Sequence, residues 1–388
     1  MERIKTILQD RFFWTLLFCV VYLVGFSQVS RRLGLAFWQP ANPFLHNLYV
    51  FEHRPERADI VFLGSSRGQT GILPSVIEEE VFRETGTTTR VFNLSQAGGG
   101  IRSEHLVLRD VLKDEKRPSI LILEVHSLGF SSNSPLINNI YFKYFATQAD
   151  ILRSYDTSVS VCGIGPRAQG FIRDASNLLW MVAKNPWQPD ARAQLARIES
   201  HKGAIPFPVE KDPNRMTPEE RELAQQIKET NLRHVQWLAK EVPYEIEGVA
   251  DRAFRDIISV CRGRGIHLII LCLPVRLDVM TKPEYREYQK FLPYITNVCG
   301  EEHIRFFNLQ EENIGLTPED FWDRTHVNKV GAAVLSRYIA REIILPARNM
   351  LSPTSTRARL TIVSGRSPSQ MCLLTQSGPH SAFPSQSR

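Results

Sequence analysis

One apolar run that ends in a glycine and two serines constrains the fold of this chain more than any other stretch. Ile60 to Leu63 form a continuous apolar segment, which is typical of a strand buried on both faces of a parallel sheet. Gly64 allows a sharp turn, so Ser65 and Ser66 stand at the carboxyl end of the strand, where open α/β sheets bind ligands. The stretch predicts an α/β fold with a candidate serine nucleophile. The alternative is an ordinary strand-to-helix turn in which a serine caps the helix.

A second stretch, near the end of the chain, offers the base that such a serine needs. Asp323 precedes His326 by three residues, just ahead of a predicted helix from about Lys329 to Ile344. At this spacing a carboxylate can orient an imidazole whose other nitrogen faces a hydroxyl, and a serine is a poor nucleophile until a positioned base takes its proton. The alternative is that Asp323 caps the last helix and His326 is a surface residue.

Together the two stretches resemble the SGNH, or GDSL-type, hydrolase superfamily. The first block of that family is a strand followed by Gly-Asp-Ser, matched here by Gly64 to Arg67. Its last block is Asp-x-x-His followed by Asn and Gly, matched by Asp323 to His326 with Asn328 and Gly331. The resemblance covers residues 57–130 and 250–345 of the chain.

The resemblance implies a role for each matched residue. Ser66 becomes the nucleophile, His326 the general base and Asp323 the carboxylate that orients it, while Ser65 and Arg67 flank the nucleophile as candidate substrate-binding residues. Ser65 departs from the usual Asp of the family. A serine at that place is found in membrane-anchored branches that modify bacterial envelope polymers, such as the D-alanyl-transfer proteins of teichoic acid and the alginate O-acetylation proteins.

The oxyanion hole is the part of the resemblance that fits least well. In the second family block an Asn precedes a glycine whose amide binds the oxyanion, and Asn93 and Gly98 match that spacing. The third block would supply Gly-x-Asn after the strand 119–124, but the chain has Glu124, Val125 and His126 there. His126 is a candidate replacement donor, and the alternative is a structural histidine. Glu124 is either a capping or a substrate-contacting carboxylate.

The rest of the core follows a strand–helix alternation. Further apolar strands are expected at 89–94, 119–124, 267–273 and 304–309, separated by helices near 74–84, 103–113, 249–262 and 283–299. Five such strands predict a three-layer, flavodoxin-like α/β sandwich with the parallel order 2-1-3-4-5. The core is expected to occupy 50–130 and 250–348. An aromatic-rich helical cap is expected at 131–249, and a disordered tail rich in Ser and Pro at 350–388.

The N-terminal residues 1–35 predict a membrane anchor. Phe12 to Phe26 are almost entirely apolar, and the uncharged residues up to Ser30 extend the segment toward the roughly 20 residues that a bilayer requires. Aromatic residues such as Trp38 and Tyr49 continue an interfacial character. The alternative is a cleaved signal peptide, although no clear small-x-small cleavage site follows. Flanking Lys and Arg residues hardly decide the orientation, and the resemblance implies an extracytoplasmic, periplasmic or extracellular, body.

The net charge and the spacing of the cysteines limit the classes of ligand that we expect the chain to bind. The net charge is +6, but four of the positive charges belong to the tail, namely Arg357, Arg359, Arg366 and Arg388. The near-neutral body gives no basis for nucleic-acid binding. The six cysteines lack metal-site spacing, so we expect no metal and no cofactor, and one disulfide involving Cys299 is an open alternative.

These observations predict a serine-dependent esterase or O-acyltransferase that acts on acylated glycans or envelope polymers. The resemblance also implies contact with the membrane and with a membrane-bound acyl-donor protein. The alternative function is a catalytically degraded scaffold or binding component of a polysaccharide assembly, which the missing Gly-x-Asn favours. The presence of Ser, His and Asp at the three motif positions favours the enzyme.

Overall fold

The computed structural model describes residues 14, 46–131, 196, 198–207, 217, 221, 225, 244–246, 248–280 and 282–351. The chain divides into two compact units, residues 1–341 and 342–388. In the second unit the described residues complete a π-helical turn, η6 (Ile339–Ile344), and form α15 (Leu345–Leu351). The sheet and the candidate site belong to the first unit.

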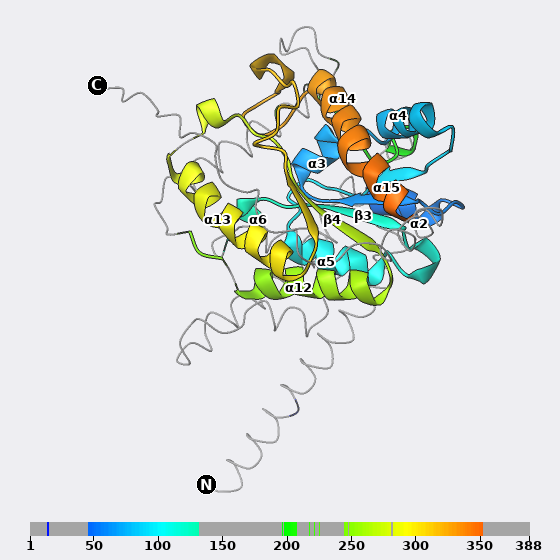
Figure 1. Cartoon of the computed structure of the whole chain (residues 1–388), viewed down its shortest axis with the longest axis horizontal. Coiled ribbons are helices and arrows are strands. Elements are labelled where there is room, and N and C mark those ends of the chain that lie inside the picture. The colour runs from blue at the N-terminus through cyan, green and yellow to red at the C-terminus, as the bar shows by residue number, and fades with distance from the viewer. Residues whose placement is uncertain are drawn as a thin grey trace, which may run out of the picture. The chain divides into compact units, whose positions relative to one another are not determined.

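A five-stranded parallel sheet forms the centre of the first unit (Figure 1). Its strands are β1 (Ile60–Leu63), β2 (Val91–Asn93), β3 (Ile120–Glu124), β4 (His267–Cys272) and β5 (Arg305–Asn308). Their order is β2-β1-β3-β4-β5, and every neighbouring pair is parallel. The predicted α/β class and the flavodoxin-like strand order are therefore confirmed.

Helices cover both faces of the sheet and make three layers. One layer holds α5 (Ile101–Asp110), α6 (Ser127–Phe130), α12 (Gly248–Gly263) and α13 (Lys282–Glu301), with α5 against α12 and α6 against α13. The other holds α3 (Ser66–Gly71), α4 (Pro74–Thr85) and α14 (Lys329–Tyr338), where α14 packs against α3 and α4. This division is what right-handed connections between parallel strands produce.

The burial of the strands explains their apolar sequences. β1 and β3 are buried at every residue, as parallel strands covered on both faces must be, whereas edge strand β5 is only half-buried. On one face Phe130 packs its ring against Phe254 of α12 and Phe291 of α13, each with a centroid separation of 5.5 Å. The helix expected near 249–262 is therefore present as α12, and its apolar side chains pack in the core.

Two expectations about individual residues require correction. Helix α2 (His46–His53) was predicted only as a continuation of interfacial character, but Leu48 and Phe51 lie in the hydrophobic core. Helix α2 therefore packs on the sheet, where the ring of Phe51 lies 5.2 Å from that of Phe92.

Cys299 is buried with a free thiol, as are Cys261 and Cys272, so the alternative of a disulfide at Cys299 is wrong. Burial raises the pKa of each thiol to about 12.

Several predictions fall on parts of the chain outside the described residues. The expected anchor, 1–35, lies outside them except for Trp14, and no helix within the described ranges is long and apolar enough to cross a bilayer. The expected cap, 131–249, is described only in short pieces, and most of it lies outside the described residues. Of the expected tail, Met350 and Leu351 belong to α15, and 352–388 lie outside.

Candidate active site

The turn after β1 presents Ser66 and hides Ser65. Ser65 is the N-cap of α3, and its hydroxyl accepts a hydrogen bond from the Arg67 amide at 3.2 Å. Ser65 is buried, with 4% of its surface exposed, whereas Ser66 is partly exposed as the first residue of the helix. The capping alternative therefore describes Ser65 and leaves Ser66 free to react. The amide of Ser66 has no acceptor within α3, because the first amides of a helix never do.

Ser66 is hydrogen-bonded to the predicted base. The distance from Ser66 Oγ to His326 Nε2 is 2.8 Å. On the other side of the ring, His326 Nδ1 lies 3.0 and 2.9 Å from Oδ1 and Oδ2 of Asp323. Nδ1 donates to the carboxylate, which leaves Nε2 able to accept the serine proton. Ser66 and His326 are 260 residues apart in sequence, yet together with Asp323 they form the continuous arrangement that nucleophilic serine chemistry requires.

Asp323 also shapes the loop that carries His326. Its Oδ1 accepts hydrogen bonds from the amides of Thr325 at 2.7 Å and His326 at 2.8 Å. The alternative in which Asp323 caps the last helix is not what the structure shows, because Asn328 is the N-cap of α14. Its side-chain oxygen accepts from the amides of Val330 and Gly331. One carboxylate thus fixes both the loop backbone and the imidazole.

The loop returns to β1 because α14 carries it there. β1 and β5 are not neighbours in the sheet, so the chain after β5 must cross back over the carboxyl edge. α14 packs against α3, and a Cβ on Gly71 at the end of α3 would lie only 3.1 Å from the Val327 side chain. This close packing places the residue after His326 directly against the helix that begins at Ser66.

An ion pair anchors the same loop from the opposite side. Arg324 Nη1 lies 2.8 and 2.9 Å from the two carboxylate oxygens of Glu284 on α13, and the two side chains are only 16% and 12% exposed. The carbonyl oxygen of Arg324 accepts from the amide of Arg276 at 2.8 Å. A partly buried pair of this kind is screened less by solvent than a surface pair.

Phe207 contacts the imidazole, a role that its place in the expected cap, 131–249, did not predict. Its ring meets His326 edge-on, with centroids 5.3 Å apart and an interplanar angle of 87°, and it stacks with Trp322 at 5.9 Å. The Phe207 carbonyl accepts from the amide of Lys329 at 2.9 Å. A single aromatic residue between two prolines carries no periodic signal, so only the folded chain identifies it.

Glu124 joins the ends of β1 and β3 beneath the nucleophile. The Ser65 amide donates to Glu124 Oε2 at 2.5 Å, and the carboxylate is 1% exposed. A Cβ on Gly64 would lie 2.6 Å from this side chain, so only glycine fits there. Burial, with a second contribution from Glu124, raises the pKa of Glu104 on α5 well above its usual value. Glu124 therefore acts here as a structural acceptor where the family would place Gly-x-Asn.

Asn93 supports the site without facing it. The side chain is fully buried, and its amide nitrogen donates to the carbonyls of Gly68 at 2.9 Å and Ile72 at 3.0 Å. Its oxygen accepts from the amide of Ser95 at 3.0 Å. The two bonds to the carbonyls of Gly68 and Ile72 hold α3 on the end of β2. Asn93 was expected near the substrate, and the structure instead makes it a residue that positions the helix that begins at Ser66.

The other two candidates for the oxyanion hole lie differently. Gly98 is exposed, and its φ of +70° is a backbone conformation that favours glycine. The glycine loop around it does approach the nucleophile turn, since the Gln96 amide donates to the Gly64 carbonyl at 2.9 Å. His126 is nearly buried beside Gly129, where a Cβ would lie 3.6 Å from Nε2. Among the described residues no hydrogen bond joins His126 to Ser66.

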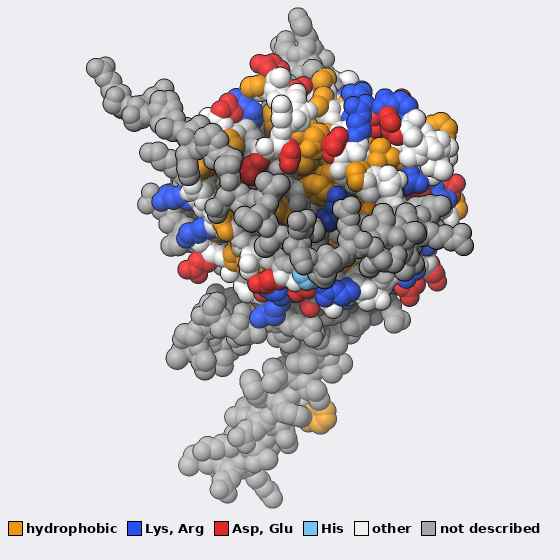
Figure 2. All heavy atoms as spheres, viewed as in Figure 1, with side chains coloured by type: hydrophobic (Ala, Val, Ile, Leu, Met, Phe, Trp, Pro, Cys, Tyr) orange, Lys and Arg blue, Asp and Glu red, His pale blue; other side chains and the backbone are white. Residues whose placement is uncertain are grey.

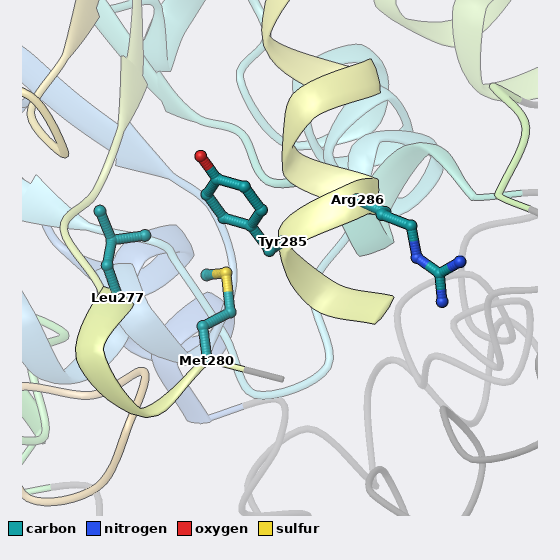
Figure 3. Close-up of a pocket in the computed structure, with 4 residues that line it drawn as sticks. All are labelled: Leu277, Met280, Tyr285 and Arg286. Atoms are coloured by element: carbon teal, nitrogen blue, oxygen red, sulfur yellow. The ribbon is translucent and has the colours of Figure 1, made fainter. Parts of the chain in front are cut away.

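A mainly apolar hollow lies beside the loops that hold the histidine. It has a volume of about 470 Å³, and Figure 3 shows Leu277, Met280 and Tyr285 facing one another across it while Arg286 extends away. Leu277 directly follows Arg276, whose amide bonds to the histidine loop. Figure 2 also shows hydrophobic side chains gathered next to α14, bordered by charged ones. Apolar surface is therefore exposed near the histidine loop and next to α14.

Comparisons with known proteins assign no family. No protein-family model matches the chain, and no curated protein matches it. Among solved structures, it is similar to a lipase/acylhydrolase from Enterococcus faecalis, with 14% identity, a TM-score of 0.33, and coverage of 74% of this chain and 95% of that chain. It is also similar to an acetyl xylan esterase, with 11% identity, a TM-score of 0.36, and coverage of 74% and 98%.

A further similar structure is a catalytic mutant of an acetylxylan esterase from Geobacillus stearothermophilus, with 13% identity, a TM-score of 0.34, and coverage of 75% of this chain and 96% of that chain. TM-scores below 0.5 do not establish a shared fold. The function proposed below therefore rests on the geometry of the site.

Proposed function

We propose that this chain is a serine-dependent ester hydrolase or O-acyltransferase in which Ser66 is the nucleophile, His326 the general base and Asp323 its orienting carboxylate. The observation that carries the proposal is the 2.8 Å hydrogen bond between Ser66 Oγ and His326 Nε2, continued from Nδ1 to Asp323. A serine capping a helix needs no such partner, and a scaffold needs no buried imidazole that is only 8% exposed and aimed at a hydroxyl.

The reaction follows from the positions of these atoms. His326 Nε2 takes the proton of Ser66 as Oγ attacks the ester carbonyl, and the negative charge moves to the carbonyl oxygen. The amide of Ser66, free at the start of α3, is the first candidate to stabilise that oxyanion, and the glycine loop at Gly98 is the second. The imidazolium then protonates the leaving alcohol. A water or a second hydroxyl, deprotonated by His326, attacks the acyl-enzyme and releases Ser66.

The substrate and location belong to the same proposal and rest on the sequence. We infer an acylated glycan or envelope polymer as the substrate, attachment to a membrane through residues 1–35 and an extracytoplasmic body. In an acyltransferase, a membrane-bound protein would deliver the acyl group. The apolar hollow of Leu277, Met280 and Tyr285 supports a site that receives a bulky ligand.

A scaffold without activity is the second candidate, and one observation favours it. The buried Glu124 carboxylate takes the place from which an asparagine would donate to the oxyanion, and a carboxylate cannot donate. This candidate predicts a serine that does not react.

Labelling with a fluorophosphonate probe tests the proposal. We expect the full chain to be labelled, Ser66→Ala to lose the label, and Ser65→Ala to retain it. Ser65→Ala is the matched control, since it removes the helix cap at a cost of about 1 kcal/mol but leaves the nucleophile. A folded wild-type chain that takes no label would favour the scaffold.

A further inference from the structure

Arg67 is a charged side chain next to Ser66 for which the described part of the chain provides no hydrogen-bond or ion-pair partner. It is the second residue of α3 and only partly exposed. No hydrogen bond or ion pair joins its guanidinium to any described residue. By contrast, Arg324 is bound to Glu284 and Arg276 to Asp278. A guanidinium carries five donors, and partly burying it without an acceptor is costly.

The position of Arg67 on its helix directs the side chain toward the reacting edge. Its Cα lies about 3.8 Å from that of Ser66, as in any pair of consecutive residues. Helical side chains lean toward the N-terminus of their helix, and the N-terminus of α3 is where Ser66 stands. The charge of Arg67 also lowers the pKa of Cys272 at the end of β4, against the larger effect of burial. The guanidinium therefore faces the carboxyl edge of the sheet.

Within the described ranges, no carboxylate near this edge forms an ion pair with Arg67. Glu124 gives its Oε2 to the Ser65 amide, and Glu311 follows β5 without an ion pair to Arg67. Burial raises the pKa of Glu104, which reduces the negative charge that an incoming anion would meet. A positive group next to the nucleophile thus remains available to a ligand.

We propose that Arg67 forms a subsite for a carboxylate carried by the ester substrate, an inference that rests on the proposed esterase or acyltransferase function. The planar guanidinium matches a carboxylate with two parallel hydrogen bonds, which fixes the substrate in orientation as well as in charge. The carboxylate can belong to the acyl group, as in a hemisuccinate ester, or to the alcohol, as in an acylated uronic acid.

Paired substrates and two variants test the subsite in the full chain. On the acyl side, 4-nitrophenyl hemisuccinate is compared with 4-nitrophenyl butyrate; on the alcohol side, an O-acetylated glucuronate is compared with the O-acetylated glucose. We expect Arg67→Gln to lower kcat/KM for one anionic ester about 10-fold or more, with less than about a 3-fold change for its neutral partner. Arg67→Lys should retain part of the preference. The anionic ester that responds identifies the source of the carboxylate.

Arg262→Gln is the control for removal of an arginine, because Arg262 pairs with Glu302 on the surface of the core. It should leave both rates unchanged. Equal losses of both substrates in Arg67→Gln, or no loss of either, would overturn the subsite.

A binding measurement separates failure of the subsite from failure of the proposed function. Calorimetry with succinate and with glucuronate requires no turnover. Binding that Arg67→Gln abolishes supports the subsite even if the fluorophosphonate probe labels no serine. Labelling of Ser66 without any charge preference in binding or turnover supports the enzyme and refutes the role of Arg67.

Discussion

Replacing Asp323 by asparagine should separate the two tasks of this carboxylate. Oδ1 accepts hydrogen bonds from the amides of Thr325 and His326 and lies 3.0 Å from the imidazole Nδ1, while Oδ2 lies 2.9 Å from Nδ1. An asparagine that keeps its oxygen at the Oδ1 position preserves both backbone bonds. Its NH₂ group then takes the position of Oδ2, 2.9 Å from Nδ1, where a donor favours the tautomer in which Nδ1 is the acceptor. The proton moves to Nε2, where it points at Ser66 and prevents the ring from acting as a base.

The expected loss is large for activity and small for stability. Reversal of the histidine tautomer in a serine triad costs about 10,000-fold in kcat, equivalent to about 5.4 kcal/mol of transition-state stabilisation. The two backbone amides then donate to a neutral amide oxygen instead of a charged carboxylate oxygen. The free energy of unfolding should therefore fall by no more than about 1–2 kcal/mol. Asp323→Ala removes the acceptor of both amides and should destabilise the chain further.

The assay is the rate of fluorophosphonate labelling of Ser66, with the free energy of unfolding measured by urea denaturation. Asp278→Asn is the matched control, since Asp278 pairs with Arg276 on an exposed loop. It should label at the wild-type rate. If Asp323→Asn labels within about 10-fold of the wild type, the imidazole does not depend on this carboxylate and the assigned triad is wrong.

Two further outcomes follow from packing and from burial. Gly64→Ala would bring a Cβ within 2.6 Å of Glu124. We expect this contact to lower the free energy of unfolding by about 1–3 kcal/mol and to slow the labelling of the serine. Gly300→Ala is the control, because Gly300 has open space around it and its substitution should not lower stability. A loss of stability in the control of the same size as in Gly64→Ala would refute the steric argument. Glu287 has its pKa raised from 4.5 to about 7, chiefly by burial and then by Glu284. Because the folded chain binds the proton of the Glu287 carboxyl more tightly than the unfolded chain does, the free energy of unfolding should fall as pH rises from about 5 to 8. Glu287→Gln should reduce this pH dependence in urea titrations. An unchanged pH dependence would show that Glu287 does not cause it.

Local patterns were sufficient to predict the frame of the molecule. The apolar runs of β1, β3 and β4 indicated strands buried on both faces, and α12 showed its buried stripe in sequence, because burial selects apolar residues at each element separately. The spacing of Asp323 and His326 likewise placed both residues on one turn, since contacts within a few residues depend mainly on local geometry.

Contacts between distant segments were beyond the reach of such patterns. Whether Ser65 or Ser66 faces His326, and whether Glu124 contacts substrate or the Ser65 amide, depends on where separate strands end relative to one another. Phe207 reaches the imidazole from a segment without periodicity.

Patterns in the sequence were therefore enough to predict the strands, the helices and the residue types at the reactive edge. They were enough because hydrophobic periodicity and turn chemistry act within each element. Packing of the elements was needed to show that Asn93 and Glu124 support the turn at Ser66 and that Asn328 caps α14. It was also needed to show that Arg67 has no hydrogen-bond partner among the described residues. Burial and hydrogen bonds between residues far apart in sequence exist only after the elements have packed, so local patterns cannot reveal them.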